Sequence, residues 1–315
     1  EARVHGLQNG QVLRAADGAY LQTGGTLTLT ARHEIGQSVD GFGFSPLALF
    51  VDANKVVASS SERENVSIVA TRAVEVGNTE TSSSGSRGGY TSVLNLSGAQ
   101  TLAGNVDASG QDIVIAADDL QISGVVRSAG AQLSITPLDP TRTIVLGDGA
   151  AGEDVLRLDD NEIARLQDGF RQIVIGMDGA GNRIVLSTSS SAGIVFKDNL
   201  ALYSNGAGGE IFIDARLSAP DIAIYGSGHT THINADQFAS AGNYLLADSA
   251  RITGAHSITA AGSITLGLPD RDLPAGEKNF VGGDPATASG DVLTLSAGGN
   301  VTFNGVVAAG EKESA

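Results

Sequence analysis

The chain has 315 residues, of which 41% are hydrophobic but only 4% aromatic, with 42 glycines and no tryptophan or cysteine. The absence of cysteine excludes a disulfide framework and thiol chemistry. The net charge of −16 argues against nucleic acid or an anionic membrane surface as a partner. No run of about 18 apolar residues occurs, so we expect this segment not to insert into a membrane.

Short segments in which apolar and small polar residues alternate recur along the chain. Such alternation is typical of a strand with one buried face. In chain order the segments are TLTLTA from Thr26, LALFVD from Leu47, VSIVAT from Val66, SVLNLSG from Ser92, DIVIAA from Asp112, QLSITP from Gln132, QIVIG from Gln172, GIVFKD from Gly193, EIFIDA from Glu210, DIAIYG from Asp221, SITLGL from Ser263 and DVLTLSA from Asp291. They predict an all-β chain.

Equivalent positions in these segments repeat at a nearly constant interval. The interval is twenty positions from Leu27 to Leu47, nineteen from Leu47 to Val66, and twenty from Ile113 to Leu133. Strands at this period, separated by Gly-, Asn- and Ser-rich corners, predict a parallel β-helix, a solenoid formed by residues 1–315 that we expect to be a single segment of a longer protein. An antiparallel sandwich or barrel is the alternative, because Asn-Gly pairs such as the one in FNGV could form hairpin turns.

One stretch departs from the strand pattern. In RLDDNEIARLQDGF the apolar residues Ile163, Leu166 and Phe170 are spaced by three and four, which is helical spacing. Asp159 followed three residues later by Glu162 matches a capping box, in which side-chain oxygens accept from the first backbone amides of a helix. The pattern predicts one short helical insertion near 159–168.

Several polar or Pro- and Gly-rich stretches predict loop excursions from the strands. The longest runs from 267 to 291, and others surround Phe42, Phe44 and Tyr90. Loops of a solenoid are where a binding surface is expected. The candidate binding residues are therefore Phe42, Phe44, Tyr90 and, within the long excursion, Phe280.

Two stretches resemble units of giant filamentous-haemagglutinin-like exoproteins and adhesins of Gram-negative and related bacteria, of the two-partner-secretion type. The first is LRLDDNEIARLQDGFRQIVIGMDGAGNRIVL, 156–186, and the second is LTLTARHEIGQSVDGFGFSPLALFVD from Leu27. In the second stretch, the motif positions are Ile35, Gly36, Pro46 and Leu47.

The resemblance implies a right-handed β-helix in a secreted or surface-attached fibre, with no active site. The implied partners are a host or neighbouring-cell surface, or other copies of the same fibre. The short helix would then be a corner insertion whose apolar side chains pack on the solenoid wall.

Two Gly-rich acidic stretches raise the question of calcium. They contain Asp148, Glu153 and Asp154, and then Asp178 with Asn182. Hard cations take oxygen ligands from such loops. Neither stretch matches the twelve-residue calcium loop or the glycine-rich nonapeptide of calcium β-rolls, so ordinary Asp-Gly turns are favoured and no cofactor is expected.

Enzymatic alternatives rest on few residues. Some β-helices cleave polysaccharides, and Asp198 and Asp214 lie near Lys197 and Arg216 in the sequence. The adjacent pairs 118–119 and 159–160 would point apart on a strand and make no acid and base pair. With no tryptophan, a sugar-stacking cleft is poorly supplied.

The favoured interpretation is therefore a non-enzymatic structural stalk. A polysaccharide-active enzyme and a glycan- or protein-binding adhesin tip are the alternatives.

Overall fold

The computed structural model describes residues 2–5, 20–32, 35–36, 49–60, 66–71, 73–77, 79–81, 90–95, 99–108, 110–149, 154–267, 280–283, 291–304 and 306–308. The candidate residues Phe42, Phe44 and Glu153 lie outside these ranges. The chain divides into two compact units. Unit 1 comprises Glu1–Asp139 and Ala164–Ile173, and unit 2 comprises Pro140–Ile163 and Val174–Ala315.

The described elements are almost all strands. In chain order they are β1 (Ala2–His5), β2 (Tyr20–Ala31), β3 (Leu49–Ser60), β4 (Val66–Ala70), β5 (Val74–Val76), β6 (Thr79–Thr81), β7 (Tyr90–Asn95), β8 (Ala99–Leu102), β9 (Val106–Asp107), β10 (Asp112–Ala116), β11 (Asp119–Ile122), β12 (Val126–Arg127), β13 (Gln132–Thr136), β14 (Thr143–Leu146), β15 (Val155–Leu158), α1 (Asp160–Ala164), β16 (Gln172–Gly176), β17 (Arg183–Leu186), β18 (Ile194–Val195), β19 (Leu200–Tyr203), β20 (Glu210–Ile213), β21 (Leu217–Ala219), β22 (Ile222–Ile233), β23 (Gln237–Ala239), β24 (Tyr244–Ile252), β25 (Ala255–Ala260), β26 (Ile264–Leu266), β27 (Phe280–Gly283), β28 (Val292–Ala297), β29 (Val301–Phe303) and β30 (Val306–Ala308).

Strand pairing is parallel throughout the part of the chain that the structure describes. The prediction of a mostly β, parallel fold is confirmed. The antiparallel alternative is wrong, because each strand pairs with one in a later stretch of chain and not with a hairpin partner. We call the chain between a strand and its next parallel partner a repeat.

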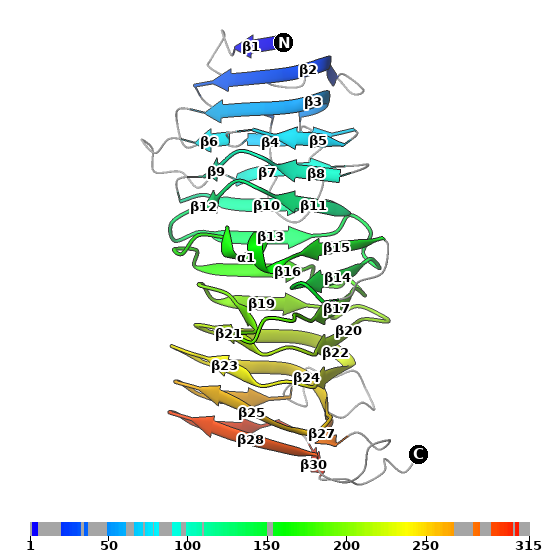
Figure 1. Cartoon of the computed structure of the whole chain (residues 1–315), viewed down its shortest axis with the longest axis vertical. Helices are drawn as coiled ribbons and strands as arrows, with labels where there is room; N and C mark the ends of the chain where they lie inside the picture. Colours follow the sequence, from blue (N-terminus) through cyan, green and yellow to red (C-terminus); the bar gives the residue numbers. More distant parts are fainter. Residues whose placement is uncertain are drawn as a thin grey trace. The chain divides into compact units, whose positions relative to one another are not determined.

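Unit 1 shows the predicted period most clearly. Ile113 on β10 pairs with Leu133 on β13, at the interval of twenty positions that the sequence indicates. The pairs β8–β11 and β9–β12 have the same register. Within this unit the strands follow one another as successive layers (Figure 1).

The predicted interval from Leu27 to Leu47 is wrong, because Leu27 pairs with Val56. The cause is that two separate pieces of chain, one at Ile35 and one that begins at Leu49, together form the strand beside β4. Ile35 bridges Val66, and Leu49 pairs with Ile68, so the two sides of the interruption align with neighbouring residues of one strand. Between them the sequence contains the stretch 37–48. This stretch lengthens the interval without adding a repeat.

The interior is filled by aliphatic side chains that alternate along the strands. In β3 the pattern of burial alternates over most of its length, so every second side chain points inward. Leu133 and Ile135 in unit 1, and Ile184, Ile213 and Ile224 in unit 2, are fully buried. Interiors of this kind need no tryptophan, because each layer contributes a few side chains of similar size.

The predicted helical insertion is confirmed but is shorter than expected. Helix α1 covers 160–164, whereas the spacing of the apolar residues suggested a helix to 168. The helix ends because the residues that follow it form backbone hydrogen bonds with Val126 on β12. The amide of Val126 donates to the carbonyl of Arg165, and the amide of Gln167 donates to the carbonyl of Val126. Leu166 is therefore buried in a bridge to Val126 and not on a helix.

The start of α1 forms the predicted capping box. The amide of Glu162 donates to Oδ1 of Asp159 at 2.8 Å, and the amide of Asp159 donates to Oε2 of Glu162 at 2.8 Å. Ile163 and Phe170 are buried, at 4% and 5% exposure, as a packing role requires.

Unit 2 contains strands whose stacking order differs from their chain order. Ile144 on β14 pairs with Leu156 on β15, only twelve positions later, and on its other side with Ile184 on β17. Ile264 pairs with Val301 at a much longer interval, because the chain from 267 to 291 intervenes. That excursion is not a loop throughout, since β27 within it pairs with β24 and β30.

Among the described residues, no helix has the length and apolar character needed to cross a membrane.

Candidate functional site: polar contacts between repeats

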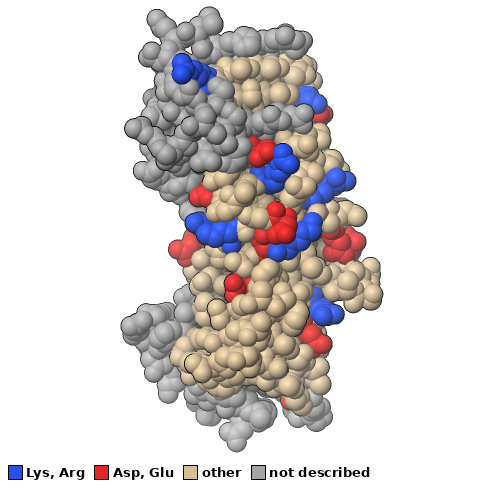
Figure 2. Space-filling view, turned by 90° about the vertical axis from the view of Figure 1, so that its left-hand side faces the viewer, with Lys and Arg blue, Asp and Glu red and all other residues tan. Residues whose placement is uncertain are grey.

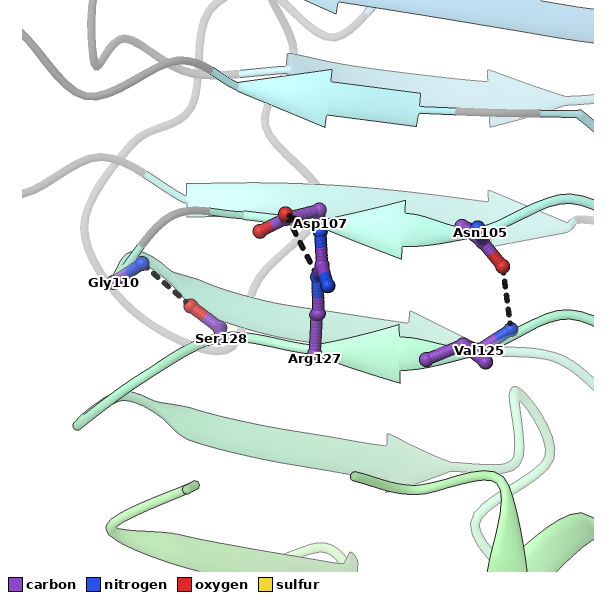
Figure 3. Close-up of polar contacts among 6 residues, drawn as sticks. All are labelled: Asn105, Asp107, Gly110, Val125, Arg127 and Ser128. Atoms are coloured by element: carbon purple, nitrogen blue, oxygen red, sulfur yellow. Dashed lines mark hydrogen bonds and ion pairs between the residues drawn. The ribbon is translucent and has the colours of Figure 1, made fainter. Parts of the chain in front are cut away.

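Polar side chains connect successive repeats on and beside the short strands β9 and β12 of unit 1, as Figure 3 shows. The amide of Val125 donates to Oδ1 of Asn105 at 3.1 Å, across an interval of 20 in the sequence. Nε of Arg127 donates to Oδ2 of Asp107 at 2.8 Å, across the same interval. The amide of Gly110 donates to Oγ of Ser128 at 2.9 Å. We call interactions of this kind inter-repeat contacts.

Aspartates at the start of a strand or between strands make inter-repeat contacts with backbone amides. Oδ1 of Asp112 accepts from the amide of Gln132 at 2.8 Å. Oδ1 of Asp118 accepts from the amides of Leu138 and Asp139, at 2.9 and 3.0 Å. At a corner the backbone leaves the strand ladder, and a short acidic side chain can accept from the amides that the ladder no longer pairs. Asp118 therefore has a structural role.

The same arrangement recurs in unit 2. Nδ2 of Asn234 donates to Oδ1 of Asp214 at 2.7 Å, across an interval of 20. Oδ1 of Asn243 accepts from the amide of Ser263 at 2.9 Å, again across 20. Where the repeat is longer the contact persists, since Oδ1 of Asp291 accepts from the amide of Gly254 at 2.7 Å across 37.

Some corners bring backbones too close together for a side chain. A Cβ atom placed on Gly124 would lie 1.9 Å from the carbonyl oxygen of Gly104, one repeat earlier. Both positions are glycine, so two successive corners stack directly on one another. This close approach helps the strand ladder to fix the spacing of the repeats.

Aromatic side chains stack from one repeat to the next on the outside of unit 2. The rings of Tyr203 and Tyr225, which are register partners, lie 4.5 Å apart at 15°. The rings of Phe212 and His232 lie 4.2 Å apart at 6°, and the guanidinium of Arg183 lies 4.4 Å from the centre of the Phe212 ring. Offset and stacked rings of this kind add to the attraction between layers.

Burial, together with Tyr225 and Asp178, raises the pKa of Tyr203 to about 12. An unfolded tyrosine loses its proton near a pH of about 10. The stabilisation linked to Tyr203 is therefore fully present below that pH and is lost as the pH rises toward the higher pKa of the folded state.

Two polar pairs are buried in unit 2. The hydroxyl of Tyr244 donates to Oε1 of Gln237 at 2.5 Å, and burial raises the pKa of Tyr244. The hydroxyl of Thr231 donates to Oδ2 of Asp248 at 2.7 Å. Each contact gives a partner to polar atoms that lie away from water, which stabilises the fold.

Three of the calcium candidates, Asp148, Asp154 and Asp178, lie in the described part of the chain, where no group of three His, Asp or Glu side chains could hold a metal ion. Oδ1 of Asp148 accepts from the amide of Asp160 at 3.3 Å. Asp178 accepts from Nδ2 of Asn205 at 2.5 Å, and Asp154 has a positive φ of 59° beside β15. Asp148 and Asp178 thus accept hydrogen bonds from protein groups.

The candidate enzymatic residues have different environments. Asp214 is exposed and bonded to Asn234, whereas Asp198 is buried at 5% exposure. Lys197 and Arg216 are exposed. Of the candidate binding residues, Tyr90 begins β7 and Phe280 begins β27, but the positions of their side chains lie outside what the structure describes.

Sequence reasoning missed the inter-repeat contacts, although a signal was present. Asp107 and Arg127 are separated by 20 in the sequence, and so are Lys55 and Glu75, whose side chains meet at 2.5 Å. Opposite charges at the strand period would have identified both pairs.

No family model, curated protein or solved structure matches the chain. The resemblance to filamentous-haemagglutinin-like exoproteins therefore stays a prediction.

Proposed function

We propose that the chain is a structural shaft, a right-handed parallel β-helix that forms part of a secreted or surface-attached bacterial adhesin. In this proposal the segment has no enzymatic activity. It holds adhesive surfaces away from the cell, toward a host or neighbouring-cell surface.

The observation that carries the proposal is the chain of contacts from each repeat to the next. Parallel ladders join the strands, and side chains such as Asp107, Asp112 and Asn243 add contacts at strand ends and corners. In a stack of this kind each repeat contacts mainly its two neighbours, so the stability of the whole is a sum of interfaces between neighbours. Such a structure resists bending because bending must stretch many hydrogen bonds at once.

The composition is consistent with this role. The chain has no cysteine, so a secreted form would depend on backbone pairing and corner contacts in place of disulfides. The charge of −16 would keep neighbouring shafts apart where charged faces meet.

Force spectroscopy of the whole chain, held at its two ends, tests the proposal. A shaft built of repeats should lose one repeat at a time. A repeat of about 20 residues would then release about 70 Å of extended chain. Addition of calcium or of a chelator should leave the pattern unchanged.

One matched variant makes this test sharper. Asp112→Ala removes the acceptor for the amide of Gln132, whereas Asp168→Ala changes an exposed aspartate of the same unit. We expect the first variant to lower the unfolding force of its repeat and the second to leave it unchanged. Loss of each whole unit in a single step would contradict the shaft.

A further inference from the structure

Two tyrosines of unit 2 lie side by side on the outside of successive repeats. Tyr203 ends β19 and pairs in register with Tyr225 on β22. Their neighbours Leu202 and Ile224 are fully buried, so the alternation along each strand points both tyrosines outward. Both side chains are half-buried, which leaves part of each ring open to solvent.

The two rings are nearly parallel, and their hydroxyl groups lie at the same end of the pair. The ring centres are 4.5 Å apart and the ring planes differ by 15°. Burial raises the pKa of Tyr203 to about 12, and a hydrogen bond with the side chain of Tyr225 is among the further causes. Parallel rings whose hydroxyl groups meet also bring together the ring carbons next to those hydroxyl groups.

The third tyrosine of unit 2 has a different environment. Tyr244 is fully buried and donates its hydroxyl hydrogen to Oε1 of Gln237. Its register partners on the two neighbouring strands are Ile222 and Ile264, which offer no second phenol. In the part of unit 2 that the structure describes, Tyr203 and Tyr225 are therefore the tyrosines placed to react with each other.

A covalent link between repeats would need chemistry other than a disulfide, because the chain has no cysteine. Charge also contributes unequally along the chain. The ion pairs of Lys55 with Glu75 and of Arg127 with Asp107 both lie in unit 1. In the view of Figure 2, the described surface toward the C-terminal strands of unit 2 carries few Lys, Arg, Asp or Glu side chains. Stacked aromatic rings join repeats of unit 2, and a bond between two of them would make that contact permanent.

We propose that Tyr203 and Tyr225 form a site of oxidative cross-linking, at which a haem peroxidase with hydrogen peroxide joins two successive repeats of unit 2 by a carbon–carbon bond. The stacked rings are held in place before oxidation, so the coupling is a reaction within one chain. The inference concerns a covalent modification and is independent of any adhesive role.

The reaction balances as follows for the pair. Each tyrosine gives up one electron and its hydroxyl proton and becomes a phenoxyl radical. The two radicals join through ring carbons next to the oxygens. Each of these carbons then loses its hydrogen as a proton, and each oxygen regains one. In total two electrons and two protons leave, and one molecule of hydrogen peroxide takes them up and becomes two molecules of water.

The test is oxidation of the whole folded chain by horseradish-type peroxidase and hydrogen peroxide, followed by mass spectrometry of the intact chain and of its proteolytic peptides. The monomer should lose the mass of two hydrogen atoms and gain dityrosine fluorescence, by the same fraction at every protein concentration. The peptide that joins Tyr203 to Tyr225 should exceed any other tyrosine pair by about tenfold or more, because these rings are already in contact.

Tyr225→Phe keeps the ring and the stack but removes the phenol, so the monomer should no longer lose two hydrogen atoms. The matched control is Tyr20→Phe, which removes a phenol at the start of β2 in unit 1 and should leave the cross-link unchanged. Circular dichroism should show that both variants fold as the wild type does. Oxidised wild-type monomer without the bond between Tyr203 and Tyr225, or a product that mainly joins separate chains, would overturn the proposal.

Discussion

The stretch 99–138 in unit 1 keeps a constant register of twenty positions at the pairs β8–β11, β9–β12 and β10–β13. Strands β14, β15 and β17 in unit 2 depart from it, because β14 pairs with β15 at a shorter interval and with β17 at twice the period. The buried positions are nevertheless alike, with aliphatic side chains at almost no exposure in both regions. Layers can therefore stack with or without a register of twenty positions. Both regions nevertheless need aliphatic side chains that point inward.

The largest expected effect tests that shared requirement. Ile115→Ala in the regular region and Ile144→Ala in the irregular region each remove a side chain that is at most 2% exposed. Each should lower the free energy of unfolding by about 2–5 kcal/mol, through lost burial and the cavity left behind. Urea unfolding followed by circular dichroism measures both. A much smaller cost for Ile144→Ala would show that β14 contributes little to its unit.

The next largest loss of stability should distinguish corners at which two backbones come close together from turns with open space around them. In Gly124→Ala the new methyl group meets the backbone of Gly104, so the corner must shift, at a cost of about 1–3 kcal/mol. Gly130→Ala is the control, because Gly130 has open space but a positive φ of 74°. Its cost should be about 1 kcal/mol, the strain of a left-handed alanine. Thermal unfolding would compare them, and equal losses would argue against close stacking of the corners.

The irregular region should depend on the capping box of α1. Asp159→Ala removes the acceptor for the amide of Glu162 and should cost about 1 kcal/mol. Asp159→Asn keeps a side-chain oxygen and should restore most of that loss. Chemical denaturation of the two variants provides the comparison. If Asp159→Ala unfolds at the wild-type denaturant concentration, the box adds nothing to stability.

The smallest effect concerns charge in the regular region. The pair Arg127 and Asp107 is partly exposed, with a 2.7 Å contact between Nη2 and Oδ2. Arg127→Ala should cost less than about 1 kcal/mol, and the difference should shrink in high salt because the charges are screened. Melting temperatures at low and high salt would reveal it. A salt-independent loss would point to packing of the arginine stem as the cause.

The parts of the fold that were predicted are those with a local signal. The alternation in DIVIAA and QLSITP identified β10 and β13 and their interval. The capping box was predictable because its two residues are three apart. Very short strands, such as β9 and β12, cannot show alternation.

The parts that were missed depend on how distant stretches of chain stack. The sequence order of β14, β15 and β17 does not reveal that β14 lies between the other two. The interruption between Gly36 and Leu49 had a signal in the loop predicted around Phe42 and Phe44, but the alignment of its two sides with β4 had none. The inter-repeat contacts are intermediate, because charge pairs at the strand period were visible but side-chain acceptors of backbone amides, such as Asn105, were not.

The interruption between Gly36 and Leu49 brings together two residues that are thirteen positions apart in the sequence. A Cβ atom on Gly36 would lie 2.8 Å from the amide nitrogen of Leu49, so the two backbones are nearly in contact. Ile35 and Leu49 both align with residues of β4. β4 therefore serves as a template that holds two separate pieces of chain in line, and the layer beside it is continuous in space although the chain that forms it is not.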